Sequence, residues 1–82
     1  MPTPKTIIDA RLLEIMDDLK NSGAIRFYQE FYDTITISKQ NIYKVRSGEM
    51  SFSMAQVYAA CKNYNINPGY LMNFDKNKFR IK

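Results

Sequence analysis

The sequence contains no histidine, no tryptophan and only one cysteine, Cys61. Without histidine it lacks the side chain that most often serves as a general base near neutral pH. One cysteine and no histidine cannot supply the ligands of a zinc finger, and one cysteine cannot form an internal disulfide. We therefore expect no catalytic site, no metal and no cofactor. We interpret Cys61 as a core thiol and expect a cytoplasmic protein that folds without an oxidising compartment.

Long apolar runs are also missing, and no stretch approaches the ~18–20 uninterrupted residues of a membrane helix. No apolar signal-peptide stretch follows the first five residues. The 82 residues are 45% hydrophobic and 24% charged, which is typical of a globular chain. We expect one soluble domain over residues 1–82, with an extended N-terminus (1–5), a tail or arm (73–82) and no membrane contact. Nothing indicates a small-molecule ligand or a separate sensor domain.

Apolar residues at helical spacing predict an all-α fold of five short helices. Thr6 is expected to cap the first helix, and the segment 21–23, ending in Gly23, to stop it. The second is expected over residues 25–35, with residues 34–37 read as a turn. The third is expected over 38–47, capped by Ser38 and closed by Gly48. Pro68 is expected to begin a short fifth helix.

The fourth helix is predicted from a capping box, in which Ser53 is followed three residues later by Gln56. Apolar or aromatic residues then recur every three or four positions, as expected of an amphipathic helix. These residues are Met54, Val57, Tyr58, Cys61 and Tyr64.

The formal charge is +4 and the sequence pI about 9.3. The net charge is −1 in residues 1–22 and −1 in 23–37, but +2 in 38–52, +1 in 53–65 and +3 in 66–82. The basic excess therefore lies on the third helix and the tail. Such a distribution favours a polyanionic partner.

The third helix carries few apolar residues, essentially Ile42 and Val45. Amide side chains can bond adenine edges in a bidentate manner, and Lys or Arg can reach guanine or phosphate, so its polar residues suit base reading. A surface helix that displays solvated polar residues would have the same composition, which leaves both interpretations open. The candidate base-reading residues are Lys39, Gln40, Asn41, Tyr43 and Lys44.

The order of residues in three segments resembles that of a known protein family. The segments are 37–48 (ISKQNIYKVRSG), 52–54 (FSM) and 66–72 (INPGYLM). The family they resemble is the lambda-repressor-like helix-turn-helix family of Cro, phage repressors and XRE-type regulators. The resemblance implies a sequence-specific double-stranded DNA-binding transcriptional regulator, specifically a repressor of phage or mobile-element type. The helix over 38–47 would read the major groove, and Ile42 and Val45 would be core residues. The residues placed near phosphates are Tyr28, Ser38, Arg46, Ser51 and Ser53.

The serines among these residues have a simpler interpretation as helix caps alone. The second helix departs from the family pattern, because Tyr28, Tyr32 and Thr36 stand where Gln, Ala and Gly are usual. A tyrosine at position 32 is expected either to push the second and third helices apart or to turn its ring outward. Tyr28 can donate its hydroxyl to a phosphate or can be a residue at the core edge.

The tail combines basic residues with Phe74, Phe79 and Ile81. These apolar residues suggest a dimer contact, an arm laid on the same domain, or a basic arm along DNA. We favour a homodimer, since a symmetric pair would place two third helices in successive major grooves of a palindromic site. The residues expected at the dimer or tail contact are Tyr70, Leu71, Phe74 and Phe79.

The main alternative is a protein-interaction module that keeps the helix-turn-helix fold. The altered second helix supports it, and its contact surface would be aromatic. Acidic residues of the first helix, Glu14, Asp17 and Asp18, form a patch with no adjacent nucleophile, which we interpret as a solvated face rather than an enzyme site. The aromatic residues of the alternative surface are Phe27, Tyr28, Phe31 and Tyr32.

Overall fold

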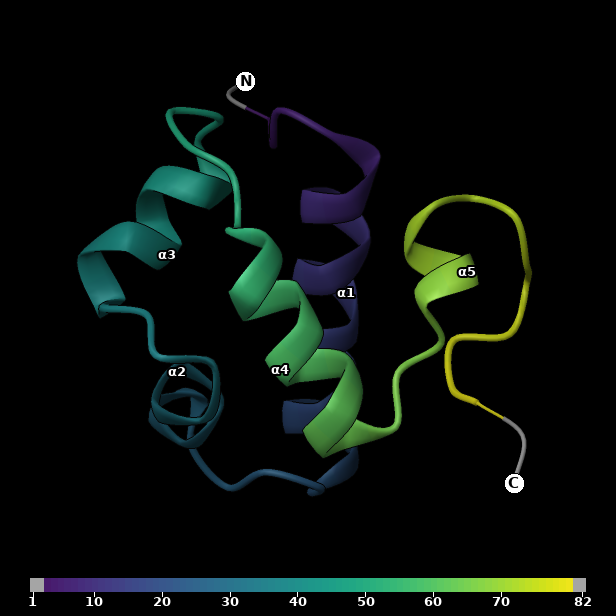
Figure 1. Ribbon diagram of the computed structural model, residues 1–82. Coiled ribbons are helices and arrows are strands. Elements are labelled where there is room, and N and C mark those ends of the chain that lie inside the picture. The colour runs from purple at the N-terminus through teal and green to yellow at the C-terminus, as the bar shows by residue number, and fades with distance from the viewer. Residues whose placement is uncertain (1–2, 81–82) are drawn as a thin grey trace.

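Five helices make up the computed structural model, which describes residues 3–80 (Figure 1). Over these residues no strand forms, and the only ladder contact is an isolated antiparallel bridge between Ile66 and Phe79. The all-α prediction is confirmed. The helices are α1 (Ile7–Ser22), α2 (Tyr28–Ile35), α3 (Lys39–Arg46), α4 (Met54–Tyr64) and α5 (Pro68–Leu71).

Helix starts coincide with the capping residues expected from the sequence. The hydroxyl of Thr6 accepts a hydrogen bond from the Asp9 amide at 3.1 Å, which satisfies one free N–H of α1. At α4, Ser53 and Gln56 form the predicted capping box, with bonds of 3.1 and 2.9 Å between each side chain and the other's amide. Gly23 ends α1 in the left-handed conformation, with φ of 84°.

The second helix begins three residues later than predicted but ends at Ile35, as predicted. It begins at Tyr28 rather than residue 25, because the Glu30 carboxylate accepts from the backbone amides of Arg26 and Phe27 and fixes the start there. It continues through Ile35, so residues 34 and 35, predicted as a turn, are helical. The connection to α3 is correspondingly short.

The core is built on α1, which packs against α2, α3 and α5. Leu12, Ile15 and Met16 of α1 have no exposed surface. Figure 1 shows α1 running behind α4, with α3 and α5 on opposite sides of it. The core joins all five helices and holds Leu12, Leu13, Ile15, Met16, Leu19, Ile25, Phe31, Tyr32, Ile35, Ile37, Ile42, Val45, Phe52, Ala60, Cys61, Ile66, Tyr70 and Leu71.

The fourth helix buries only part of its apolar stripe. Ala60 and Cys61 are buried, as expected for a core thiol, and this burial raises the pKa of the Cys61 thiol. In contrast, Met54 is 73% exposed and Tyr58 is 65% exposed. Helical spacing alone would place all five stripe residues on one face, but the neighbouring helices cover only one side of that face.

The tail is folded back on the domain over the residues described, up to 80. The amide of Asn67 donates to the carbonyl of Lys78, and that of Arg80 donates to the carbonyl of Asn65, both at 2.9 Å. The tail lies beside α5, away from α3 (Figure 1). Of the three arrangements considered for the tail, this part of the chain adopts the one in which it is laid on its own domain. Ile81, which belongs to the same prediction, lies outside the described residues.

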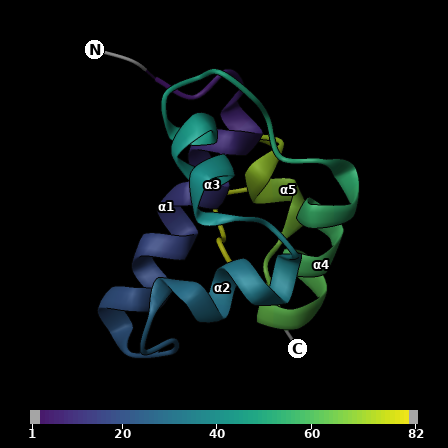
Figure 2. The ribbon, with the colours of Figure 1, turned by 90° about the vertical axis from the view of Figure 1, so that its left-hand side faces the viewer.

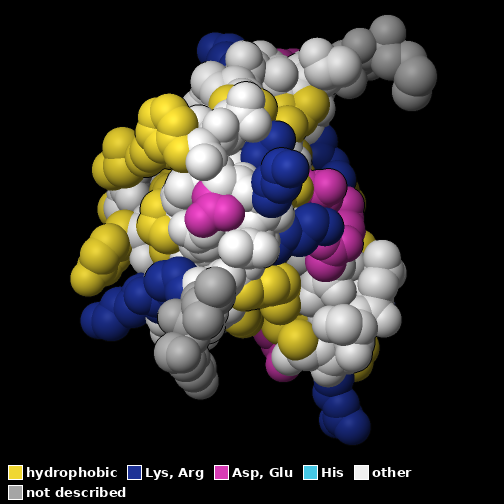
Figure 3. Space-filling view, turned by 90° about the vertical axis from the view of Figure 1, so that its right-hand side faces the viewer, with side chains coloured by type: hydrophobic (Ala, Val, Ile, Leu, Met, Phe, Trp, Pro, Cys, Tyr) yellow, Lys and Arg dark blue, Asp and Glu magenta, His cyan; other side chains and the backbone are white. Residues whose placement is uncertain are grey.

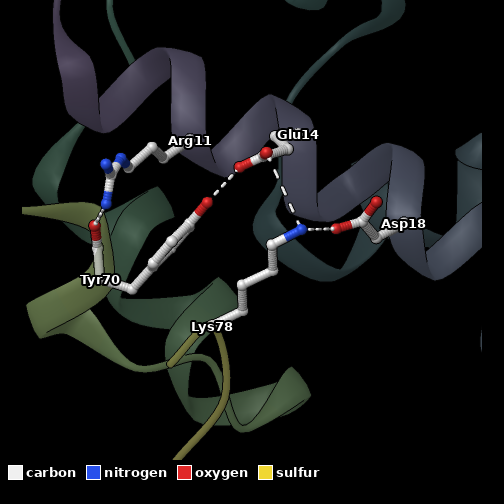
Figure 4. Close-up of polar contacts among 5 residues, drawn as sticks. All are labelled: Arg11, Glu14, Asp18, Tyr70 and Lys78. Carbon is white, nitrogen blue, oxygen red and sulfur yellow. Dashed lines mark hydrogen bonds and ion pairs between the residues drawn. The ribbon is translucent and has the colours of Figure 1, made fainter. Parts of the chain in front are cut away.

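Side chains of α1 hold α5 and the tail (Figure 4). Lys78 donates to Asp18 at 2.6 Å and lies 3.8 Å from a Glu14 oxygen. The Tyr70 hydroxyl donates to Glu14, and the Arg11 guanidinium donates to the Tyr70 carbonyl at 2.7 Å. The acidic residues of α1 therefore connect segments that are about 60 residues apart in sequence.

The contacts of Lys78 with Asp18 and of Tyr70 with Glu14 predict a loss of stability at alkaline pH. The bond to Asp18 raises the pKa of Lys78, and the bond to Glu14 raises the pKa of Tyr70. A group with a raised pKa contributes its full stabilisation below its unfolded pKa and loses it as pH rises through the folded pKa. The free energy of unfolding should therefore fall above about pH 10. In urea unfolding, a Lys78→Met/Tyr70→Phe variant should show a shallower decline, and an unchanged decline would contradict this assignment.

Two glycines offer a matched test of backbone packing. Gly48 (φ +82°) and Gly23 (φ +84°) are both left-handed, but a Cβ at Gly48 would collide with the Thr3 carbonyl oxygen, whereas nothing lies within 4 Å of a Cβ at Gly23. Gly23→Ala should cost about 1 kcal/mol of unfolding free energy, from the conformation alone. Gly48→Ala must also displace the 3–5 segment, so its loss should be larger by at least about 1 kcal/mol. Equal losses in denaturant unfolding would contradict this packing.

Candidate nucleic-acid interface

The outward face of α3 is polar and basic. Lys39, Gln40, Tyr43 and Lys44 are exposed, and Asn41 is half-buried. Tyr43 is 56% exposed and has the Lys39 ammonium 6.0 Å above its ring. Figure 2 looks onto this side of the molecule, with α3 above α2. Four of the five candidate base-reading residues thus share one accessible face, which has no acidic residue.

Two fully buried side chains fix α3 to the domain. Ile42 and Val45 have no exposed surface, in agreement with the periodicity and with the resemblance. Ser38 caps the helix by accepting from the Asn41 amide at 3.1 Å. Since the anchors are three residues apart, the opposite face of the helix is directed away from the core.

The turn between α2 and α3 contains only residues 36–38. Thr36 has φ of 60° and so adopts the left-handed conformation for which the family pattern uses glycine. The Ile37 amide donates to the Tyr32 carbonyl at 2.9 Å, and Gln56 of α4 donates to the Thr36 carbonyl at 3.3 Å. The turn is therefore held from both α2 and α4 despite its unusual residue.

Asp17 of α1 connects α2 and α3. One of its carboxylate oxygens accepts from the Tyr28 hydroxyl at 3.0 Å and from the Arg46 guanidinium at 2.9 Å. Burial, followed by the bond to Asp17, raises the pKa of Tyr28. Both Tyr28 and Arg46 were placed near phosphates by sequence, but in this structure each already bonds a carboxylate. Tyr28 is half-buried, as a residue at the core edge would be.

Glu14, Asp17 and Asp18, interpreted from sequence as a solvated face, are partly exposed, but they also form ion pairs across the fold. Each of these side chains is paired with a residue from another element. Glu14 pairs with Tyr70 and Lys78, Asp17 with Arg46, and Asp18 with Lys78. Sequence reasoning missed these pairs because their partners are distant in sequence. The only available signal was the presence of opposite charges on α3 and the tail.

The aromatic residues of α2 do not form the broad exposed surface expected for an interaction module. Phe31 has no exposed surface and Tyr32 is 7% exposed, whereas Phe27 is 67% exposed. The Tyr32 ring therefore does not turn outward; it is stacked on Tyr28 with a centroid distance of 6.4 Å. Burial raises the pKa of the Tyr32 hydroxyl. The altered second helix fills core space instead of displaying its rings.

The serines assigned to phosphates lie at helix starts or in the loop that precedes α4. Ser38 and Ser53 are exposed N-caps of α3 and α4, and Ser51 is exposed two residues before Ser53. The capping bonds of Ser38 and Ser53 confirm the interpretation of these two serines as helix caps, whereas Ser51 is the N-cap of neither helix. A helix N-terminus also favours an anion, because its free amides and dipole are positive there.

The residues expected at a dimer or tail contact fall into two groups. Tyr70 and Leu71 are 9% and 1% exposed, so their side chains belong to the core of this domain and are not available to a second copy. These two residues were predicted as dimer contacts, but the packing of α5 on α1 buries them. Phe74 is 84% exposed and Phe79 is 38% exposed.

No protein-family model matches the sequence, and no curated protein or solved structure is significantly similar to it. Among residues 3–80, no group of three His, Cys, Asp or Glu side chains is arranged to hold a metal ion. Within the same residues, no helix combines the length and apolar character needed to cross a bilayer. The functional interpretation accordingly depends on the outward face of α3.

Proposed function

We propose that the protein is a sequence-specific double-stranded DNA-binding regulator that reads the major groove with α3. The observation that carries this proposal is the exposure of Lys39, Gln40, Tyr43 and Lys44 on one face of a helix held by only two buried residues. An α-helix fits the major groove, and polar side chains on its outer face can reach base edges.

Some exposed residues of α3 suit contacts with base edges, and others suit contacts with either base edges or the phosphate backbone of DNA. Gln40 can accept from and donate to an adenine edge, while Lys39 and Lys44 suit guanine O6/N7 or phosphate. Tyr43 lies between them and adds an apolar ring for contact with a thymine methyl group. Asn41 is half-buried and near the helix start, so it would reach only the nearest base edge.

Phosphate contacts would orient the helix in the groove. The N-termini of α3 and α4, with Ser38, Ser51 and Ser53, offer amides and hydroxyls to phosphate oxygens. Tyr28 and Arg46 already bond Asp17, so a phosphate would have to share them with that carboxylate. We assign these two residues a smaller part in binding than the serines and lysines.

The regulatory mechanism in this proposal is steric occlusion of a promoter by a homodimer. A two-fold pair would place two α3 helices about 34 Å apart, on half-sites one helical turn apart. Phe74 and Phe79 are exposed and are the part of the predicted dimer contact that remains available to a second copy.

The test is selection of binding sites from a random duplex DNA library at near-physiological salt, followed by sequencing. Salt must be present because phosphate contacts alone produce nonspecific binding. Enrichment of an inverted repeat with half-sites about one turn apart is expected. A library that stays random while circular dichroism shows folded protein would contradict the proposal.

A further inference from the structure

An exposed apolar surface runs along α4 and the end of α5. Met54 and Tyr58 are 73% and 65% exposed and lie one helical turn apart on α4, while Met72, directly after α5, is 43% exposed. Hydrophobic side chains gather along the left edge of Figure 3, the side on which α4 lies, with Lys or Arg side chains below them. None of these three side chains lies on the outward face of α3.

Two hollows line this surface and share α4 as a wall. One, of about 160 Å³, is bordered by Met54, Val57 and Met72; the other, of about 230 Å³, is bordered by Tyr58 and Pro68. The α4 residues that border the two hollows, at positions 54, 57, 58, 61 and 62, span about 12 Å along the helix, the length of two turns of a bound helix. The start of α1 also borders the first hollow, through Ile8 and Asp9, and Pro68 of α5 borders the second. We call the two hollows, with the α4 surface between them, the α4/α5 groove.

The charges around the α4/α5 groove have one sign. Lys62 and Arg80 border its second hollow, and the sequence has no Asp or Glu from residue 50 to residue 74. The acidic residue at the first hollow, Asp9, is 1% exposed and bonds the Phe52 amide, so it lies beneath the surface. A second copy placed symmetrically on this groove would bring like charges together, which disfavours it as the occupant.

We propose that the α4/α5 groove binds an acidic amphipathic helix of a partner protein. Two apolar side chains three or four residues apart would enter the hollows, and carboxylates beside them would pair with Lys62 and Arg80. The flexible thioethers of Met54 and Met72 can adapt to apolar side chains of different shape. The base-reading face lies on α3 and most of the groove lies on α4 (Figure 1). The two surfaces meet at Ser51, which borders the first hollow and which the proposed function places near phosphate.

The experiment is selection from a displayed library of random peptides of about 15 residues, the length of four helical turns. Wild-type protein is the target, and a Tyr58→Ser variant is used for counter-selection. Enriched peptides should be negatively charged, with apolar residues at i and i+3 or i+4. A selected peptide, synthesised and labelled, should bind Tyr58→Ser at least 10-fold and Lys62→Glu at least 5-fold more weakly than wild type.

The control variant is Lys76→Glu, which makes the same charge change on an exposed tail residue outside the groove. It should leave the affinity for the selected peptide unchanged at near-physiological salt. The proposal is overturned by a selection without enrichment, by basic enriched peptides, or by peptides that bind Tyr58→Ser as well as wild type. It is also overturned if sedimentation shows a wild-type dimer that Tyr58→Ser converts to a monomer, since the groove would then hold a second copy.

Discussion

Replacing Gln40 and Lys44 together by alanine is expected to reduce affinity for the selected DNA site at least about 30-fold. A good base contact contributes about 1–3 kcal/mol of discrimination, and an ammonium lost from the interface weakens binding further. Both residues are exposed, and the buried anchors Ile42 and Val45 are untouched, so the fold should remain. Fluorescence anisotropy with the selected duplex, at several salt concentrations, measures the loss and the change in salt dependence.

The matched control is Lys76→Ala/Asn77→Ala, which also removes one ammonium and one amide side chain. Both control residues are exposed on the tail, which lies away from α3 (Figure 1). Its affinity should stay within about 3-fold of wild type, the small change expected for distant charges at physiological salt. If the α3 variant retained wild-type affinity, α3 would not be the reading helix and the proposed function would fail.

Replacing Asp9 by alanine is expected to produce a large loss of stability, about 2–3 kcal/mol of unfolding free energy. Asp9 is 1% exposed, and its carboxylate accepts from the buried Phe52 amide at 3.0 Å. Alanine would remove a hydrogen bond to a charged group and leave that amide buried without a partner. It would also remove a negative charge from the first turn of α1, where the helix dipole favours one. Urea unfolding measures the difference.

Two further variants separate the causes of that loss. Asp9→Asn keeps an oxygen that can accept from Phe52, so it should lose clearly less stability than Asp9→Ala. Asp33→Ala removes an exposed aspartate that bonds only exposed Gln29 in this structure, and it should change stability by no more than about 0.5 kcal/mol. Equal losses for Asp9→Ala and Asp33→Ala would contradict a structural role for Asp9.

This role of Asp9 links stability to the candidate interface. Phe52 immediately precedes Ser53, the cap of α4, and lies in the loop that follows α3. The bond from Asp9 therefore ties this loop to the first turn of α1. Asp17, two turns further along α1, binds Arg46 at the other end of the same loop. One helix thus orients α3 through two carboxylates.

Helix ends could be predicted because their causes are local. Thr6, Ser38 and Ser53 cap helices through amides three residues away, and Gly23 closes α1 through its own backbone conformation. The prediction was less accurate for α2, where the Glu30 carboxylate sets the start through the amides of Arg26 and Phe27.

The sequence by itself determined five short helices, three of them with identified N-caps, and a third helix with two apolar anchors and a polar, basic remainder. Only the tertiary structure decided that Asp17 meets Arg46, that Lys78 meets Asp18, and that Tyr58 stays exposed on α4 while Cys61 is buried. Capping and periodicity act within a few residues of chain and are written in neighbouring letters. Ion pairing and burial depend on which distant segments approach each other, and that approach is set by packing of the whole core.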